Sequence, residues 1–313
     1  MTTPLVKRLV KRIMKGVGAL AVIYVMICIY MWTAQRQIIF VPEPQLQTTP
    51  DRNGMPYQEV RIPSGSGEDR GELHGWWIPA QQADSAQGDQ SRDQSRYQSR
   101  DQSSTQNVES GPVLLYLHGN YRNIGYNAEH AMRLHSLGYN LLLIDYRGYG
   151  KSSGGDPSEA KVYEDAEAAW EYLIKQRGIA THRLFIYGHS LGGAVAIDLA
   201  VRHPEAAGLI AESTFTSIVA MAQRDYPWLP VAQLLNQKFD SLDKVSKLKI
   251  PALFMHGTWD KKIPYEMSRQ LFEQTPEPKY LKLIEGGEHS NNSGIAWQEY
   301  RNTVTVFVQK HTR

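Results

Sequence analysis

The chain has 313 residues, of which 42% are hydrophobic and 21% are charged, as in ordinary globular proteins. This composition excludes a chain that is disordered throughout and a multi-pass membrane protein. The formal net charge is +2, but the basic residues are unevenly placed. The charged residues before Glu43 are Lys7, Arg8, Lys11, Arg12, Lys15 and Arg36. The rest of the chain has 28 basic and 32 acidic residues, so it lacks the basic footprint of a nucleic-acid-binding protein.

An apolar segment follows the basic N-terminal tail, residues 1–15. Residues 16–34 carry no charged side chain, and a helix of this length would measure roughly 28 Å, close to the thickness of a hydrocarbon core. Tyr30 and Trp32 lie near its far end, as aromatic side chains do at a membrane interface. Cys28, the single cysteine, has no partner within the chain for a disulfide. We therefore predict a transmembrane anchor that binds the lipid bilayer.

A cleaved signal peptide is the alternative for this segment, because it too combines a basic stretch with an apolar one. The sequence Trp32-Thr33-Ala34 is a poor small-x-small cleavage site. Five basic residues precede the span and one follows it. The positive-inside rule then predicts a single-pass protein with its N-terminus in the cytoplasm and the folded domain on the non-cytoplasmic side.

After a linker at residues 35–56, the pattern of residues 57–313 predicts one α/β domain. Short apolar runs alternate with helical stretches, which indicates parallel β-α-β units with helices on both faces of a mostly parallel, eight-stranded sheet. The expected strands are residues 58–62 and 73–78, which form an antiparallel edge, then 113–117, 140–144, 184–187, 209–211, 252–255 and 280–284. Residues 158–177 and 295–310 are expected helices. Ligands of such sheets bind beyond the carboxyl ends of the strands.

Two segments depart from this alternation. Residues 81–110 consist mostly of Gln, Ser, Asp and Arg, and they have too few apolar side chains to offset the entropy lost on ordering, so we predict a disordered surface insertion. Residues 214–249 follow the sixth strand and are apolar without a clear period. They predict a small cap over the binding edge, which would suit an apolar or acylated substrate; simple packing on the sheet is the alternative.

The strand at 184–187 runs directly into Gly188-His189-Ser190-Leu191-Gly192-Gly193 and then into a helix-forming stretch. A G-x-S-x-G sequence in this strand-turn-helix context is a nucleophile elbow. The glycines are needed because the turn strains the serine backbone and brings strand and helix close together. Ser190 is therefore the predicted catalytic nucleophile, in an α/β-hydrolase fold.

A serine hydroxyl needs a base to remove its proton, and that base needs an orienting acid. In this fold the chain order is Ser, acid, His. Asp260 follows the strand at 252–255 and His289 follows the strand at 280–284, so we predict that they complete a catalytic triad with Ser190. Glu212, after the strand at 209–211, is the alternative acid.

An oxyanion formed on the substrate needs backbone N–H donors. Leu191 directly follows the nucleophile, and Asn120 follows the strand at 113–117, so these two are the predicted oxyanion-hole donors, with Tyr121 as the alternative to Asn120. Gly150-Lys151-Ser152 resembles the end of a phosphate-binding loop, but Asp145 stands where that loop requires glycine. We therefore expect no nucleotide, and the sequence predicts no cofactor and no metal site.

Six motifs together carry a family resemblance. They are His118-Gly119-Asn120, residues 145–152, residues 188–193, residues 212–217, His256-Gly257-Thr258-Trp259-Asp260 and Gly287-Glu288-His289. From about Tyr57 onward the chain resembles the membrane-anchored α/β-hydrolase-domain serine hydrolases, which include bacterial S9-like membrane hydrolases and eukaryotic protein depalmitoylases. The resemblance implies Ser190, Asp260 and His289 as the triad.

The expected activity is hydrolysis of an ester or thioester through an acyl-serine intermediate. A serine peptidase of the S9-like type is the first alternative, because it shares the mechanism and differs only in its substrate pocket. A non-catalytic membrane adaptor is the second, and an intact triad argues against it.

Overall fold

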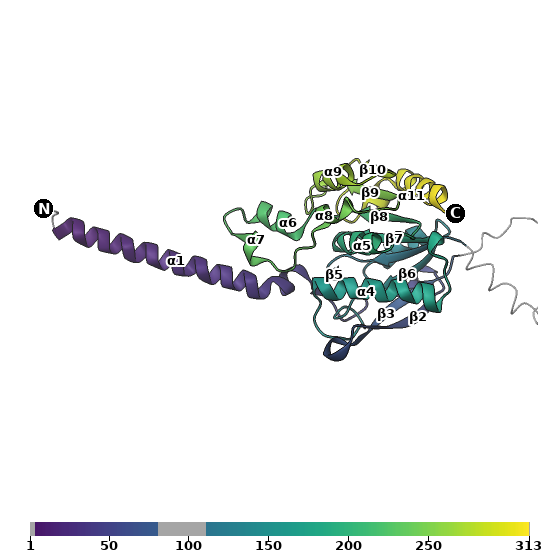
Figure 1. Cartoon of the computed structure of the whole chain (residues 1–313), viewed down its shortest axis with the longest axis horizontal. Helices are drawn as coiled ribbons and strands as arrows, with labels where there is room; N and C mark the ends of the chain where they lie inside the picture. Colours follow the sequence, from purple (N-terminus) through teal and green to yellow (C-terminus); the bar gives the residue numbers. More distant parts are fainter. Residues whose placement is uncertain (1–3, 81–110, 313) are drawn as a thin grey trace, which may run out of the picture.

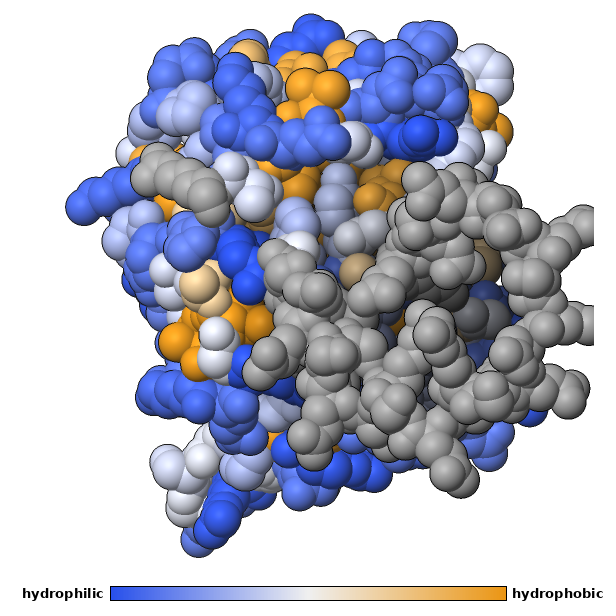
Figure 2. All heavy atoms as spheres, turned by 90° about the vertical axis from the view of Figure 1, so that its right-hand side faces the viewer, coloured by the Kyte–Doolittle hydropathy of each residue, from blue (hydrophilic) through white to orange (hydrophobic). Residues whose placement is uncertain are grey.

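The computed structural model describes residues 4–80 and 111–312, so the predicted insertion at 81–110 lies outside the described residues. Figure 1 shows helix α1 (Pro4–Ile39) projecting from one end of a layered α/β body. Among the described residues, the stretch Val6–Ile39 is the one helix long and apolar enough to cross a membrane. Figure 2 views the opposite end of the molecule, where hydrophilic side chains predominate outside the part that grey atoms cover.

The central sheet has eight strands in the order β10-β9-β8-β7-β4-β6-β3-β2. Its strands are β2 (Gln58–Ser64), β3 (Gly71–Ile78), β4 (Val113–Leu117), β6 (Asn140–Ile144), β7 (Leu184–His189), β8 (Gly208–Glu212), β9 (Ala252–Gly257) and β10 (Lys279–Ile284). The strands from β6 to β10 in this order pair in parallel, whereas β3 pairs antiparallel with both β2 and β6. The predicted mostly parallel α/β-hydrolase sheet is confirmed.

Helices cover both faces of this sheet. The described helices after α1 are α3 (Ala128–His135), α4 (Glu159–Glu171), α5 (Leu191–Arg202), α6 (Ile218–Asp225), α7 (Val231–Leu234), α8 (Ser241–Val245), α9 (Tyr265–Gln274), α10 (Asn292–Ile295) and α11 (Trp297–His311). A π-helical turn, Tyr172–Gln176, extends α4. Short 3-10 turns lie at Pro50–Asn53, Gly67–Asp69 and Thr181–Arg183.

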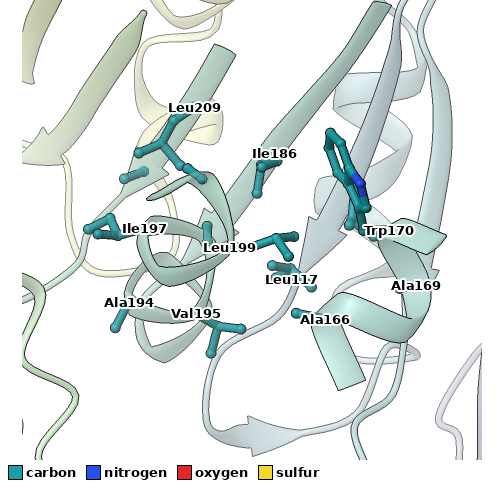
Figure 3. Close-up of a cluster of buried hydrophobic side chains, with 14 of the residues drawn as sticks. Leu117, Ala166, Ala169, Trp170, Ile186, Ala194, Val195, Ile197, Leu199 and Leu209 are labelled. Carbon is teal, nitrogen blue, oxygen red and sulfur yellow. The ribbon is translucent and has the colours of Figure 1, made fainter. Parts of the chain in front are cut away.

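Alternation along the buried strands divides the core into two halves. In β4, Leu115 and Leu117 belong to the cluster on the side of α4 and α5, whereas Leu114 and Tyr116 belong to the cluster on the side of α3 and α11. Successive side chains of a strand point to opposite faces, so a strand covered by helices on both sides is apolar throughout. Figure 3 shows the first half, with α5 and α4 packing side chains against the strands.

The end of α1 is built into the body. Ile39 and Phe40 are buried in the core, and β1 (Val41–Pro42) pairs in parallel with β5 (Tyr121–Arg122) in a small second sheet. The Asn123 side-chain amide donates hydrogen bonds to the carbonyl oxygens of Glu43 and Gln45, both at 2.8 Å. The beginning of the expected linker therefore lies against the domain.

The core half in Figure 3 provides a stability test. Leu199 of α5 is fully buried among Ile186, Leu117 and Trp170, so Leu199→Ala should lower the free energy of unfolding by about 3 kcal/mol through lost transfer energy and a cavity. Val306→Ala, at a 63% exposed site in α11, is the matched control and should change it by less than about 0.5 kcal/mol. Urea unfolding measures both, and equal effects would contradict this description of the core.

Candidate active site

The predicted elbow is a tight crossing of β7, α5 and β4. Ser190 has φ 56° and ψ −122°, a strained conformation for a residue with a side chain. A Cβ atom on Gly188 would lie 2.1 Å from the Gly192 carbonyl oxygen, and one on Gly192 would lie 2.0 Å from that of Leu117. The Ser190 N–H donates to the Glu212 carbonyl oxygen at 2.9 Å. Glycine is therefore required on both sides of the serine.

The structure brings the three predicted triad residues together at the carboxyl ends of β7, β9 and β10. The Ser190 hydroxyl lies 3.0 Å from Nε2 of His289, and Nδ1 of His289 lies 2.8 Å from Oδ2 of Asp260. Ser190 and Asp260 are buried, while the His289 side chain is 13% exposed. With Asp260 ionised, Nδ1–H of His289 donates to the carboxylate and Nε2 accepts from the serine. These two hydrogen bonds allow a proton to move from Ser190 to His289.

Asp260 is held on both of its oxygens. The backbone N–H groups of Lys262 and Ile263 donate to Oδ1 at 2.8 and 2.9 Å, and Nε2 of His256 lies 3.1 Å from Oδ2. Burial by itself would raise the pKa of Asp260, but hydrogen bonds from His256 and His289 outweigh it and bring the pKa below its usual range. Asp260 therefore stays a carboxylate at neutral pH.

His256 and His189 are neighbours of the triad that the sequence interpretation did not single out. His256 shares its Nε2–H between Asp260 and the Ile263 carbonyl oxygen, at 3.0 Å from the latter. Nε2–H of His189 donates to the His289 carbonyl oxygen at 2.7 Å. Their position beside Gly257 and Ser190 in the motifs was the available signal, but which polar atom each one meets depends on loops distant in the chain.

Glu212, the alternative acid, occupies a separate network. Its carboxylate accepts hydrogen bonds from the hydroxyls of Tyr187 and Tyr300 and from the Asn292 amide, the last two at 2.9 Å. Burial would raise the pKa of Glu212, but the charges of His130 and His189 and the hydrogen bonds lower it. Of the two candidates, it is Asp260 that is hydrogen-bonded to His289.

The predicted oxyanion donors flank the serine. Leu191 is the first residue of α5, and a Cβ atom on Gly119 would lie 3.2 Å from Cβ of Ser190, so the loop that carries Asn120 runs past the nucleophile. The Asn120 side-chain amide donates to the Ile39 carbonyl oxygen at 2.8 Å. The backbone carbonyl oxygen of Asn120 accepts from the Val41 N–H at 3.0 Å. Oxyanion binding by these two residues stays a prediction.

A cavity of about 370 Å³ opens beside the serine, and most of the residues that line it are polar or charged. Its lining residues are Gly119, Asn120, Tyr121, Tyr126, Asn127, Glu129, His130, Arg133, His189, Ser190, Glu212, Lys262, His289, Ser290, Asn291 and Gly294. In the described part of the chain, no residue of the expected cap at 214–249 belongs to this lining. Helices α6 and α7 of that segment lie beside the body end of α1, whereas α8 packs against α5 and α9 (Figure 1).

The motif at residues 145–152 has a structural role. Asp145 accepts a hydrogen bond from the Ile124 N–H at 2.8 Å, and the buried Arg147 guanidinium pairs with Asp165 at 2.6 Å. Nζ of Lys151 donates to the Glu59 carboxylate at 2.8 Å. Across the described ranges, no group of three His, Cys, Asp or Glu side chains is arranged to hold a metal ion.

The pKa of His189 predicts that the free energy of unfolding depends on pH. Burial, with the charge of His289, lowers the pKa of His189 to about 4 from 6.5. As the pH falls through this interval, the unfolded chain takes up a proton that the folded chain refuses, so stability present above pH 6.5 is lost towards pH 4. The shift corresponds to about 3 kcal/mol.

His189→Gln, whose amide can still donate to the His289 carbonyl, should lose correspondingly less stability over this pH range than the unmodified chain. The exposed His182→Gln is the control and should behave like the unmodified chain. Urea unfolding at pH 7, 5.5 and 4 measures the difference, and parallel losses in all three proteins would refute the assignment.

Comparison with known proteins finds relatives over most of the chain. A family model described as serine aminopeptidase, S33, matches residues 109–242. Uncharacterized protein Rv2307c of Mycobacterium tuberculosis (strain ATCC 25618 / H37Rv) is 30% identical over 285 residues, covering 90% of this chain and 89% of the relative. The human alpha/beta hydrolase domain-containing protein 17B is 36% identical over 198 residues, covering 63% of this chain and 66% of the relative.

Solved structures share the fold. The esterase Pf2001 of Pyrococcus furiosus superimposes with a TM-score of 0.65 at 20% identity, covering 88% of this chain and 99% of the esterase. The acylaminoacyl peptidase of Pyrococcus horikoshii gives a TM-score of 0.57 at 15% identity, covering 82% of this chain and 42% of the peptidase. With its fold, its elbow and these relatives, the chain belongs to the α/β-hydrolase family of serine hydrolases.

Proposed function

We propose that this serine hydrolase is membrane-anchored and cleaves an ester or thioester through an acyl-serine intermediate. The observation that carries the proposal is the hydrogen-bonded chain from Ser190 through His289 to Asp260, with distances of 3.0 and 2.8 Å. A serine activated in this way is the nucleophile of acyl transfer.

In the proposed reaction, Oγ of Ser190 attacks the carbonyl carbon while His289 takes the hydroxyl proton. The negative charge on the carbonyl oxygen is bound by the N–H groups of Leu191 and Asn120, each worth about 3 kcal/mol in such sites. His289 then protonates the leaving group, which departs and leaves an acyl-serine. His289 next removes a proton from water, whose attack releases the acid and restores Ser190; Asp260 stabilises the imidazolium in both steps.

The charged side chains that line the cavity favour a peptidase as the second candidate. Arg133, Glu129 and Lys262 line it, and charged groups of both signs can bind the polar backbone or termini of a peptide. An ester or thioester with a polar portion next to the scissile bond fits the same walls. The apolar or acylated part of the proposed substrate would then lie outside the cavity, towards α1 and the membrane.

We also propose that α1 spans the bilayer with its N-terminus in the cytoplasm. Its 36 residues exceed the length needed for a span. The five basic residues before position 16, against Arg36 after the apolar stretch, favour this orientation.

The nucleophile can be tested by labelling the full chain with a fluorophosphonate in detergent. The unmodified protein should be labelled and Ser190→Ala should not, because the probe reacts with an activated serine. Hydrolysis of a nitrophenyl ester should fall by roughly 10⁴-fold or more in the variant. If the folded, unmodified protein escaped labelling, the proposed triad would not be assembled.

The bond type can be tested with esters, acyl thioesters and peptide amides that share one acyl group. Cleavage of the first two without release from the amides supports the proposal, because an amide needs stronger leaving-group protonation by His289. Efficient amide cleavage that is lost in Ser190→Ala would establish the peptidase instead.

The orientation predicts protease accessibility. In sealed vesicles whose outer surface is the non-cytoplasmic side, added trypsin should reach the domain, for which residues 81–110 offer Arg92, Arg96 and Arg100. In inverted vesicles the domain should be protected until detergent opens the membrane. Protection in the first preparation and cleavage in the second would reverse the proposed topology.

A further inference from the structure

The segment after α6 lies against the apolar part of α1. Leu229, Val231 and Leu235 form a small buried cluster, and partly buried side chains of α1 and α6 pack against it. Those side chains are Ile27, Cys28, Met31, Ile218, Val219 and Ala222. We call residues 226–235 the cap tip. It covers one side of α1 in the half of the expected span that is nearer the body.

Hydrogen bonds at both ends of this interface hold the cap tip and α1 together. The Tyr24 hydroxyl donates to the Trp228 carbonyl oxygen at 3.3 Å, and the two rings are 6.2 Å apart. Directly after the cap tip, at the body end, the Gln35 side-chain carbonyl accepts from the N–H groups of Asn236 and Gln237 at 2.8 and 3.2 Å. The cap tip therefore lies at a fixed level along the helix axis.

Neither of the two packed segments carries a charged side chain. Residues 16–35 of α1 have no charged side chain, and neither do residues 226–237. Tyr226 is 42% exposed and Trp228 is 54% exposed at the cap tip. Tyr and Trp are the side chains that favour the membrane interface, because an apolar ring carries one polar group.

The length of α1 decides where the cap tip lies. If the cap tip stayed in water, α1 from Tyr24 onward would stay in water with it. Only residues 16–23 would then remain for the span, and eight residues measure about 12 Å against a hydrocarbon core of about 30 Å. Moving the span towards the N-terminus would bury Lys15, Arg12 and Lys11, which is costly. α1 can therefore cross the bilayer only with the cap tip immersed.

We infer that the cap tip inserts into the leaflet on the domain side, beside α1, as a second membrane contact. This inference rests on the proposed span of α1. Tyr30 and Trp32, both exposed on α1, mark the interface, and Tyr24 lies six residues deeper, about 9 Å along the axis. Helices that bind membranes in the interfacial plane are buried to about this depth.

Insertion places the mouth of the cavity at the membrane surface. Tyr121 and Tyr126 line the cavity and are exposed, and β5, which contains Tyr121, pairs with β1 directly after α1. Arg224 at the end of α6 donates to the carbonyl oxygen of Lys262, another lining residue, at 2.9 Å. The substrate class is then an ester or thioester held in the bilayer, whose acyl chain stays in the leaflet while its scissile carbonyl reaches Ser190.

Depth-dependent quenching tests the insertion on the full chain in phosphatidylcholine vesicles. Single cysteines labelled with an environment-sensitive fluorophore are introduced by Trp228→Cys and Tyr226→Cys in a Cys28→Ser background. Leu20→Cys, 67% exposed on α1, is the lipid standard, and Val306→Cys, 63% exposed on α11 at the far end of the body, is the water standard. Lipid-borne doxyl groups and aqueous iodide are the quenchers.

Quenching by doxyl lipid of the labels at 228 and 226 should be within about twofold of that of the Leu20→Cys label. Quenching of the same two labels by iodide should be at least about threefold weaker than that of the Val306→Cys label. If both labels instead follow Val306→Cys while Leu20→Cys follows the lipid, the cap tip is in water and the inference is overturned, although α1 spans. If Leu20→Cys is also quenched by iodide, α1 does not span and the inference falls with it. Fluorophosphonate labelling of each variant reports separately on the fold and the hydrolase proposal.

Discussion

The close approach of α5 to β4 beneath Ser190 is the constraint on which the rest of the site depends. Gly192 lies against the Leu117 carbonyl so closely that a Cβ atom would collide, and Ser190 accepts a strained backbone to make the turn. That strain is offset by the hydrogen bond to the Glu212 carbonyl and by the Thr214 hydroxyl, which donates to the Ser190 carbonyl oxygen at 2.8 Å. A wider turn would withdraw the hydroxyl from His289.

The parallel sheet brings the other site residues to the strained turn at Ser190. β7, β9 and β10 end at the same edge of the sheet. His289 therefore meets Ser190, 99 positions earlier in the chain, and Asp260, 29 positions earlier, within hydrogen-bond distance. Buried histidines then fix the loops, with His256 on Asp260 and His189 on the carbonyl of His289. Buried polar groups need such partners, and here each partner also orients a member of the triad. Stability and positioning therefore come from the same hydrogen bonds.

The C-terminal end of α1 is built into the domain. Asn120, the predicted oxyanion donor, binds the Ile39 carbonyl and accepts from Val41, so the last turn of α1 supports the loop beside the serine. The rings of Phe40 and Phe239, 6.0 Å apart, join the same helix end to the segment that follows the cap tip. These contacts fix the direction in which α1 leaves the body relative to Ser190.

The sequence by itself determined the strands, their order along the chain, the elbow and the candidate triad, because alternation, glycine spacing and strand-end position depend on neighbours within a few residues. The boundaries moved only slightly, as in β7, which runs to His189 instead of residue 187. Tertiary structure alone decided that Asp260 rather than Glu212 meets His289, and that His189 and His256 are polar partners of the site. It also decided that the cap tip packs on α1 and does not line the cavity. Each of these outcomes is a contact between segments distant in the chain, and no local pattern specifies which buried donor will meet which acceptor.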